Sequence, residues 1–142
     1  MTRPLLSLLT ASLLVLLAGL APARADDAAT ARSVIENQIN AFLSDDMAAA
    51  YALASPSIQR LYPDPARFFD MVKRGYQPVY RPGNFAFGRS KAAQDGSDMI
   101  QEVIIQGADG QDWTALYALE RQPDGSFRIN GVQMIKAAAP QT

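Results

Sequence analysis

The chain has 142 residues, and its 13 Lys and Arg against 14 Asp and Glu give a formal net charge of −1. That length suits one domain, and a near-neutral chain lacks the basic surface of a nucleic-acid-binding protein. The chain contains neither Cys nor His, which excludes disulfides, catalysis by a thiol or an imidazole, and metal sites built on these side chains. We therefore expect no cofactor, no metal and no nucleic-acid partner.

The first 25 residues have the pattern of a secretory signal peptide. Arg3 precedes an apolar run from Leu5 to Leu20, and Ala23-Arg24-Ala25 supplies the small residues that a signal peptidase recognises. The run is short for a membrane span, which needs about 20 residues. We predict a signal peptide over residues 1–25, cleavage after Ala25, a periplasmic location and no stable membrane anchor after cleavage. The alternative is a retained anchor.

Two helices are predicted between residues 28 and 54. The first runs from about Ala28 to Leu43 with Asp27 as its N-cap, because apolar residues recur at helical spacing along one side. The second starts after the cap candidates Ser44 and Asp45 and ends near residue 54, because the Ser-Pro pair that follows disfavours helix.

The third predicted helix has the clearest boundaries. Asp64 stands at the N-cap, Pro65 at the first helical position and Gly75 just past the end. A short turn over residues 57–62 precedes this helix. Residues 76–83 follow it with the sequence YQPVYRPG, whose prolines predict an extended connector rather than a helix.

Three Asp-Gly pairs predict the turns of a four-stranded antiparallel meander in the second half of the chain. The pairs stand at residues 95–96, 109–110 and 124–125. The strands are expected near residues 84–92, 98–106, 111–121 and 126–134. Arg121 and Arg128 flank the last turn, and we expect both side chains to be solvated.

The turns also predict which residues share a face of the sheet. A loop of either two or four residues around Asp109-Gly110 gives the same assignment, because both are even. A three-residue loop over residues 123–125 extends the assignment to the last strand. The face expected to pack on the helices then carries Ile100, Glu102, Ile104, Trp113, Ala115, Tyr117, Leu119, Phe127, Ile129, Gly131 and Gln133.

The opposite face of the predicted sheet is too apolar for a surface that only water covers. A large exposed apolar patch is unusual on a monomer, so we predict a homodimer formed through this second face. Its apolar residues would be Met99, Val103, Ile105, Leu116, Ala118, Val132 and Met134.

Several segments of the chain resemble a bacterial family described as domain of unknown function 4864. They are RSVIENQINAF, RGYQPVYRP, QEV at residues 101–103, and WTALYALERQPDGSFRI, and the resemblance covers about residues 30 to 135. The expected order, three N-terminal helices followed by a curved antiparallel meander, also resembles the nuclear transport factor 2-like (cystatin-like) superfold. The resemblance therefore implies an α+β cone over residues 26–136, in which three N-terminal helices pack on a curved four-stranded antiparallel meander. Residues 137–142 would form a C-terminal tail.

The resemblance carries no assigned chemistry, so the functional hypotheses depend on the residues themselves. We expect a non-catalytic module that binds a small apolar or amphipathic molecule in the cone between helices and sheet. One alternative is an isomerase- or hydratase-type enzyme that uses Glu102 and tyrosines, and another is a structural or protein-interaction domain with a closed core. The candidate ligand-binding residues are Tyr76, Tyr80, Arg81, Glu102, Trp113, Tyr117 and Gln133.

Glu102 is the candidate for chemistry, because the predicted register turns it toward the helices. Burial of a carboxylate is costly unless the group is paired or hydrogen-bonded. Tyr117, Gln133 or Arg81 would then satisfy it, or its pKa would rise. The alternative is that a bulge in the strand over residues 98–106 turns Glu102 into water and Gln101 inward.

Overall fold

The computed structural model describes residues 23–137, in which five helices precede four strands. In chain order the elements are α1 (Ala23–Leu43), α2 (Met47–Ala52), α3 (Pro56–Leu61), α4 (Pro65–Gly75), α5 (Gln77–Tyr80), β1 (Pro82–Ala92), β2 (Asp98–Gly107), β3 (Asp112–Arg121) and β4 (Phe127–Lys136). Most of the predicted signal peptide and of the predicted tail lies outside the described residues. Within residues 23–137, no helix combines the length and the hydropathy that a membrane crossing requires.

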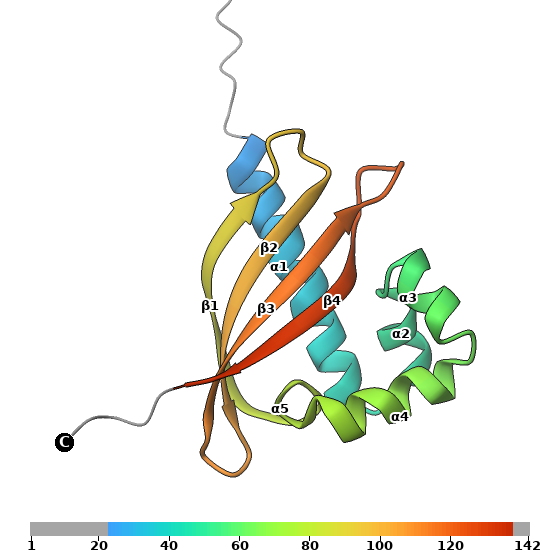
Figure 1. Ribbon diagram of the computed structural model, residues 1–142, viewed down its shortest axis with the longest axis vertical. Coiled ribbons are helices and arrows are strands. Elements are labelled where there is room, and N and C mark those ends of the chain that lie inside the picture. Colours follow the sequence, from blue (N-terminus) through green and yellow to red (C-terminus); the bar gives the residue numbers. More distant parts are fainter. Residues whose placement is uncertain (1–22, 138–142) are drawn as a thin grey trace, which may run out of the picture.

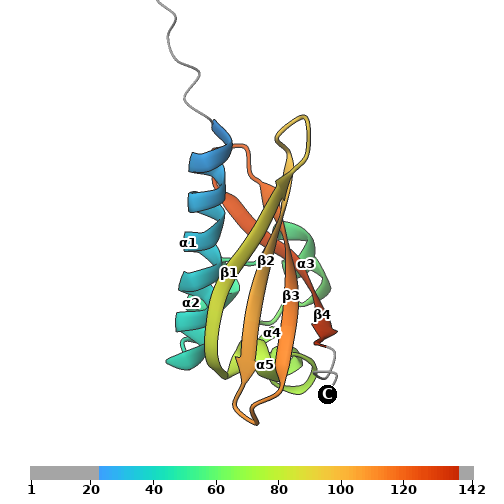
Figure 2. The ribbon, with the colours of Figure 1, turned by 90° about the vertical axis from the view of Figure 1, so that its left-hand side faces the viewer.

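The strands form one antiparallel sheet in the order β1-β2-β3-β4, so each strand pairs with the next along the chain. Figures 1 and 2 show that the sheet is twisted and that α1 lies along one of its faces. The predicted α+β fold, with helices before a four-stranded antiparallel meander, is confirmed.

The helical half differs from the prediction at three places. α1 begins at Ala23, so Asp27 lies inside the helix instead of capping it. Residues 56–61 form α3, and residues 77–80, which were expected to be extended, form the single turn of α5. Pro78 is compatible with that turn because the first N–H groups of a helix have no partner within the helix. Residues 23–137 therefore contain five helices where the sequence predicts three.

The β2–β3 loop reverses the predicted face of β2. This loop has three residues, because the Gly107 N–H donates to the Gln111 carbonyl over 2.8 Å. Gly110 completes the turn at a φ of 82°, which suits a glycine in a three-residue hairpin loop. An odd loop pairs Gln101 with Tyr117 and Glu102 with Leu116. Met99, Gln101, Val103 and Ile105 are therefore buried against the helices, and the prediction that Ile100, Glu102 and Ile104 point inward is wrong.

A bulge in β4 corrects the prediction for the second half of that strand. Phe127 and Ile129 are buried as expected. The register then shifts: Leu119 pairs with Ile129, but the neighbouring Ala118 pairs with Gly131. Beyond this bulge Val132 and Met134 pack against the core, and Gly131 and Gln133 lie on the opposite face, because a one-residue insertion exchanges the two faces of a strand.

The face of the sheet away from the helices therefore differs from the face that we predicted. Of the seven predicted apolar residues, only Leu116 and Ala118 lie on it. The other five belong to the core or pack against it. We call five apolar residues that do lie on this face the outer patch. They are Ile100, Ile104, Leu116, Ala118 and Ile135, and the three isoleucines are 41%, 43% and 44% exposed.

Arg121 holds the start of α1 against two hairpins and is not solvated as predicted. Its Nη2 lies 2.7 Å from Asp27 Oδ2. Its Nε donates to the Gly96 carbonyl over 2.8 Å, and its Nη1 donates to the Gly125 carbonyl over 3.2 Å. The guanidinium carbon also lies 4.5 Å from the centre of the Phe127 ring. One side chain thus connects α1 with the β1–β2 and β3–β4 turns.

Candidate functional site

A cavity of about 80 Å³ lies between the helices and β4 and is partly open to the surface. Side chains from α1, α3, α4 and α5 line it together with residues of β4. Nearly all of the lining is apolar. The lining residues are Gln38, Phe42, Ala54, Ile58, Phe68, Met71, Val72, Tyr76, Val79, Ile129, Gly131 and Val132.

The helices that form one wall are attached to the free edge of β4 beside the bulge. Ser55 N–H donates to the Ile129 carbonyl over 2.8 Å, and the Ile129 N–H donates to the Leu53 carbonyl over 2.9 Å. The Ser55 hydroxyl lies 2.7 Å from Oδ1 of Asn130, the extra residue of the bulge. These bonds pair edge groups that no fifth strand reaches among the described residues, and they place Ala54 and Ile58 in the cavity wall.

α4 supplies the opposite wall because its boundaries and its apolar side are well defined. Asp64 caps the helix as predicted, and its Oδ1 accepts from the Ala66 N–H over 2.9 Å. Pro65 occupies the first turn. Phe68 and Val72 then stand four residues apart on one side of the helix, where both are buried and line the cavity.

Gln38 is the buried polar side chain of the cavity wall. It is 3% exposed, and its Nε2 donates to the Ala50 carbonyl over 3.1 Å. A carbonyl can only accept, so this contact fixes which end of the amide is nitrogen. Sequence analysis missed Gln38. Its position between Ile35 and Phe42, within the buried side of α1, is the pattern that could have revealed it.

Of the seven predicted site residues, the structure places Tyr76 in the cavity wall. Arg81 and Trp113 instead line a separate groove of about 270 Å³ at the end of the β2–β3 hairpin. Tyr80 contacts the end of α1 beside Arg81, Tyr117 lies in the core, and Glu102 and Gln133 lie on the outer face. The predicted residues therefore do not form one site.

Glu102 lies on the face of the sheet opposite the cavity. Its side chain is 22% exposed and packs over Gly88, where a Cβ atom would collide with Glu102 Oε1. Glu102 Oε2 is 3.7 Å from Nη2 of Arg89, whose side chain is 93% exposed. The alternative orientation, with Glu102 outward and Gln101 inward, is the one observed. Its cause is the odd length of the β2–β3 loop and not a bulge in β2.

The Gln101 side chain connects β2 with the bulge of β1 and with α1. Its Oε1 accepts from the Ser90 hydroxyl over 2.5 Å and from Arg32 Nε over 3.3 Å. Its Nε2 donates to the Gly88 carbonyl over 3.2 Å, at a bulge in β1 where strand pairing is interrupted. Both ends of the buried amide are thus bonded, which leaves neither for a ligand.

Tyr117 is fully buried on the inner face of β3. Its hydroxyl has no hydrogen-bond partner in the described part of the chain. Burial raises the pKa of Tyr117 far above its ordinary value, because the charged phenolate would lose its hydration. The hydroxyl is therefore protonated at all physiological pH values.

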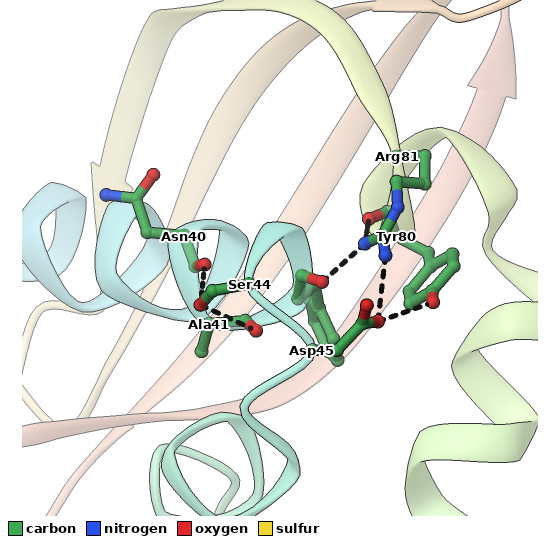
Figure 3. Close-up of polar contacts among 7 residues, drawn as sticks. Asn40, Ala41, Ser44, Asp45, Tyr80 and Arg81 are labelled. Carbon is green, nitrogen blue, oxygen red and sulfur yellow. Dashed lines mark hydrogen bonds and ion pairs between the residues drawn. The ribbon is translucent and has the colours of Figure 1, made fainter.

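Asp45, Tyr80 and Arg81 form a polar cluster at the end of α1 (Figure 3). Asp45 Oδ1 accepts from the Tyr80 hydroxyl and from Arg81 Nη2, each over 2.8 Å. Arg81 Nη1 also donates to the Phe42 carbonyl, and its guanidinium carbon lies 4.0 Å from the centre of the Tyr80 ring. The hydrogen bonds from Tyr80 and then from Arg81 lower the pKa of Asp45. This Asp45 cluster fastens α5, which carries the cavity residue Val79, to α1.

Sequence analysis treated Asp45 as a cap of the second helix and so missed this cluster. In the structure the cap of α2 is Asp46, whose Oδ1 accepts from the Ala49 N–H over 3.1 Å. Asp45 instead ends α1, where the Asp46 N–H donates to the Ala41 carbonyl over 2.8 Å and the Asp45 N–H to the Phe42 carbonyl over 3.0 Å. This pair of bonds is the Schellman arrangement of helix ends.

The comparisons with known proteins identify a family and nothing more specific. The model of one family, described as "Domain of unknown function (DUF4864)", matches residues 24–142. No curated protein and no solved structure matches the chain.

Proposed function

The chain belongs to the DUF4864 family, and we propose that it is a non-catalytic module that binds a small apolar or amphipathic molecule in the cavity between α4 and β4. The observation that carries the proposal is the apolar, partly open cavity of about 80 Å³. Pockets for drug-sized ligands are larger, about 300 Å³ or more, whereas a dry cavity of about 150 Å³ takes benzene. The cavity therefore suits a very small molecule or the end of an aliphatic chain.

The apolar lining indicates how strongly such a ligand would bind. Each buried methylene contributes about 0.8 kcal/mol, so four methylenes contribute about 3 kcal/mol before the cost of immobilisation. Binding through this cavity alone would be weak, with a dissociation constant no tighter than the millimolar range. A ligand with further contacts outside the cavity would bind more tightly.

The residues around the cavity favour binding over catalysis. Among residues 23–137, those that line the cavity include no acidic and no basic side chain. An isomerase or hydratase would need a carboxylate near its substrate, and Glu102 lies on the other face of the sheet. A closed-core structural domain would not require the opening to the surface.

Two broader proposals accompany this function. We propose that the fold is a nuclear transport factor 2-like cone, which the order of helices before a twisted antiparallel meander supports. We also propose export to the periplasm, which the residue pattern before Asp26 supports.

The binding proposal can be tested by titrating ¹⁵N-labelled protein with straight-chain alcohols and alkanes while recording backbone amide shifts. We expect saturable shifts at Val72, Ile129 and Val132. Val132→Phe should fill part of the cavity and abolish them. Leu61→Phe is the control, because Leu61 is 72% exposed and does not line the cavity. Shifts that never saturate, or that survive in Val132→Phe, would refute binding at this cavity.

A further inference from the structure

The amide of Gln38 leaves a hydrogen-bond acceptor at the wall of the cavity. Its Nε2 is used by the Ala50 carbonyl. Gln38 is only 3% exposed. Among the described residues, no donor forms a hydrogen bond to its Oε1. Tyr76 also lines the cavity, but no hydrogen bond joins its hydroxyl to Gln38. Among the described residues, the fully buried side-chain polar atom without a partner is the Tyr117 hydroxyl and not Gln38 Oε1. Gln38 Oε1 is therefore accessible from the cavity that Gln38 lines, and its donor is a water or a ligand in that cavity.

An acceptor on a largely buried side chain is more favourable with a donor than without one, and native proteins pair almost all such groups with protein, water or ligand. The cavity surface around Gln38 is apolar, so a water there would have few other partners, and an ordered buried water normally makes about three hydrogen bonds. A ligand that fills the apolar space and also donates to Gln38 would satisfy both requirements at once.

The chemistry of that donor is restricted by the rest of the lining. No charged side chain lines the cavity within residues 23–137, so an ammonium or a carboxylate would be buried without a counter-charge, which is strongly unfavourable. A carboxylate would also place negative oxygens against the Gln38 oxygen. An ether or a ketone offers only acceptors. A hydroxyl is a small neutral group that donates.

From these observations we infer that the cavity selects an aliphatic alcohol, either a short one or the hydroxylated end of a longer chain, and that Gln38 Oε1 accepts its hydrogen bond. The inference rests on the proposed function and specifies its ligand class. Gln38 is then the specificity-determining residue, and the apolar walls supply the remaining affinity.

The test compares 1-pentanol with its isomer butyl methyl ether, which has the same atoms but no donor. Titrations followed by amide shifts at Ile129 and Val132 should give a dissociation constant about five- to tenfold lower for the alcohol, which corresponds to one net hydrogen bond. In Gln38→Met, which keeps the length of the side chain, the two isomers should bind equally. The Ala50 carbonyl would still accept from the Leu53 N–H over 3.3 Å.

Gln59→Met is the matched control, because the Gln59 amide also donates to backbone carbonyls but Gln59 does not line the cavity. It should keep the preference for the alcohol. Equal binding of the two isomers to the unmodified protein would overturn the inference and leave the proposed function standing, whether or not Gln38→Met folds. If neither isomer produces saturable shifts, both the inference and the proposed function fail. A preference for the alcohol that survives in Gln38→Met would also overturn the role of Gln38.

Discussion

Asp45 has a backbone φ of 52°, in the left-handed region that glycine usually occupies at a helix end. A side chain other than glycine is strained there, although Asp tolerates the conformation better than most. The carboxylate compensates by holding Tyr80 and Arg81. The position thus combines the end of α1 with the attachment of α5, and glycine could perform only the first of these.

The lowered pKa of Asp45 predicts a pH-dependent contribution to stability. Because its folded pKa lies below the ordinary value of 3.8, its contribution is present above that value and is lost as the pH falls through the folded pKa. Asp45→Asn should therefore lower the melting temperature at pH 7, and the difference from the unmodified protein should shrink in acid.

The control for this prediction is Asp70→Asn. Asp70 forms an exposed helical ion pair with Arg74 over 3.1 Å, and such pairs contribute little. Thermal unfolding between pH 2 and 8 measures both variants. If Asp45→Asn has the same melting temperature as the unmodified protein at pH 7, the Asp45 cluster does not stabilise the fold.

The buried hydroxyl of Tyr117 gives a second prediction at this scale. Because it has no partner in the described structure, folding strips its water without replacing it, which is unfavourable. Tyr117→Phe removes only the hydroxyl and should leave stability unchanged or raise it by up to about 1 kcal/mol. Urea unfolding measures the difference. A loss of about 1 kcal/mol or more would mean that the hydroxyl is hydrogen-bonded after all.

At the level of the elements, Arg121 connects parts of the chain that are far apart in sequence. It joins α1 to the β1–β2 and β3–β4 turns through one ion pair and two hydrogen bonds to carbonyls. Hydrogen bonds to a charged group contribute about 1.5 to 3 kcal/mol each when partly buried, although their loss is not additive. We expect Arg121→Gln to destabilise the protein by about 2 kcal/mol in urea unfolding.

Arg128→Gln is the matched control, because Arg128 lies in the same hairpin. Its side chain makes no hydrogen bond or ion pair among the described residues, and its loss should cost less than about 0.5 kcal/mol. If the two variants unfold alike, the contacts of Arg121 do not hold α1 to the sheet.

The elements also show what the sequence could and could not predict. The Asp-Gly pairs correctly predict the turns, because glycine accepts the positive φ that Gly96, Gly110 and Gly125 adopt. The same pair fits hairpin loops of two, three or four residues, so loop length, and with it the face of β2, could not be decided. The bulge at Asn130 depends on tertiary bonds to Ser55 and has no local pattern.

The candidate site was only partly predictable for the same reason. The expectation of an apolar space between helices and sheet agrees with the cavity, and Tyr76 does line it. Gln38 was overlooked because a polar residue in a helix is ordinarily assigned to the solvated side. Its position on the buried side of α1 indicates its burial, but its partner, the Ala50 carbonyl of α2, cannot be predicted from α1 alone.

For the whole molecule, the homodimer stays a prediction, now with the outer patch as its interface. No described element covers this face, and an isologous contact would let one copy cover the isoleucines of another. Light scattering at micromolar concentration should give twice the mass of one chain. Ile104→Lys should halve that mass, because a charge would be buried at the interface.

Leu61→Lys is the control for the dimer, since Leu61 is 72% exposed but lies on α3, away from the outer patch. It should leave the mass unchanged. A single-chain mass for the unmodified protein would contradict the prediction.

The three-residue β2–β3 loop has a consequence for how this chain tolerates insertions and deletions. Removing Ala108 alone would make the loop even, and the residues of β2 would exchange faces relative to β3. Glu102 would then enter the core and Val103 would face water. Changes of two residues would preserve the inward set. In related chains that fold in the same way, the length of this loop should therefore vary in steps of two residues. An odd number of loop residues matters more than any particular number.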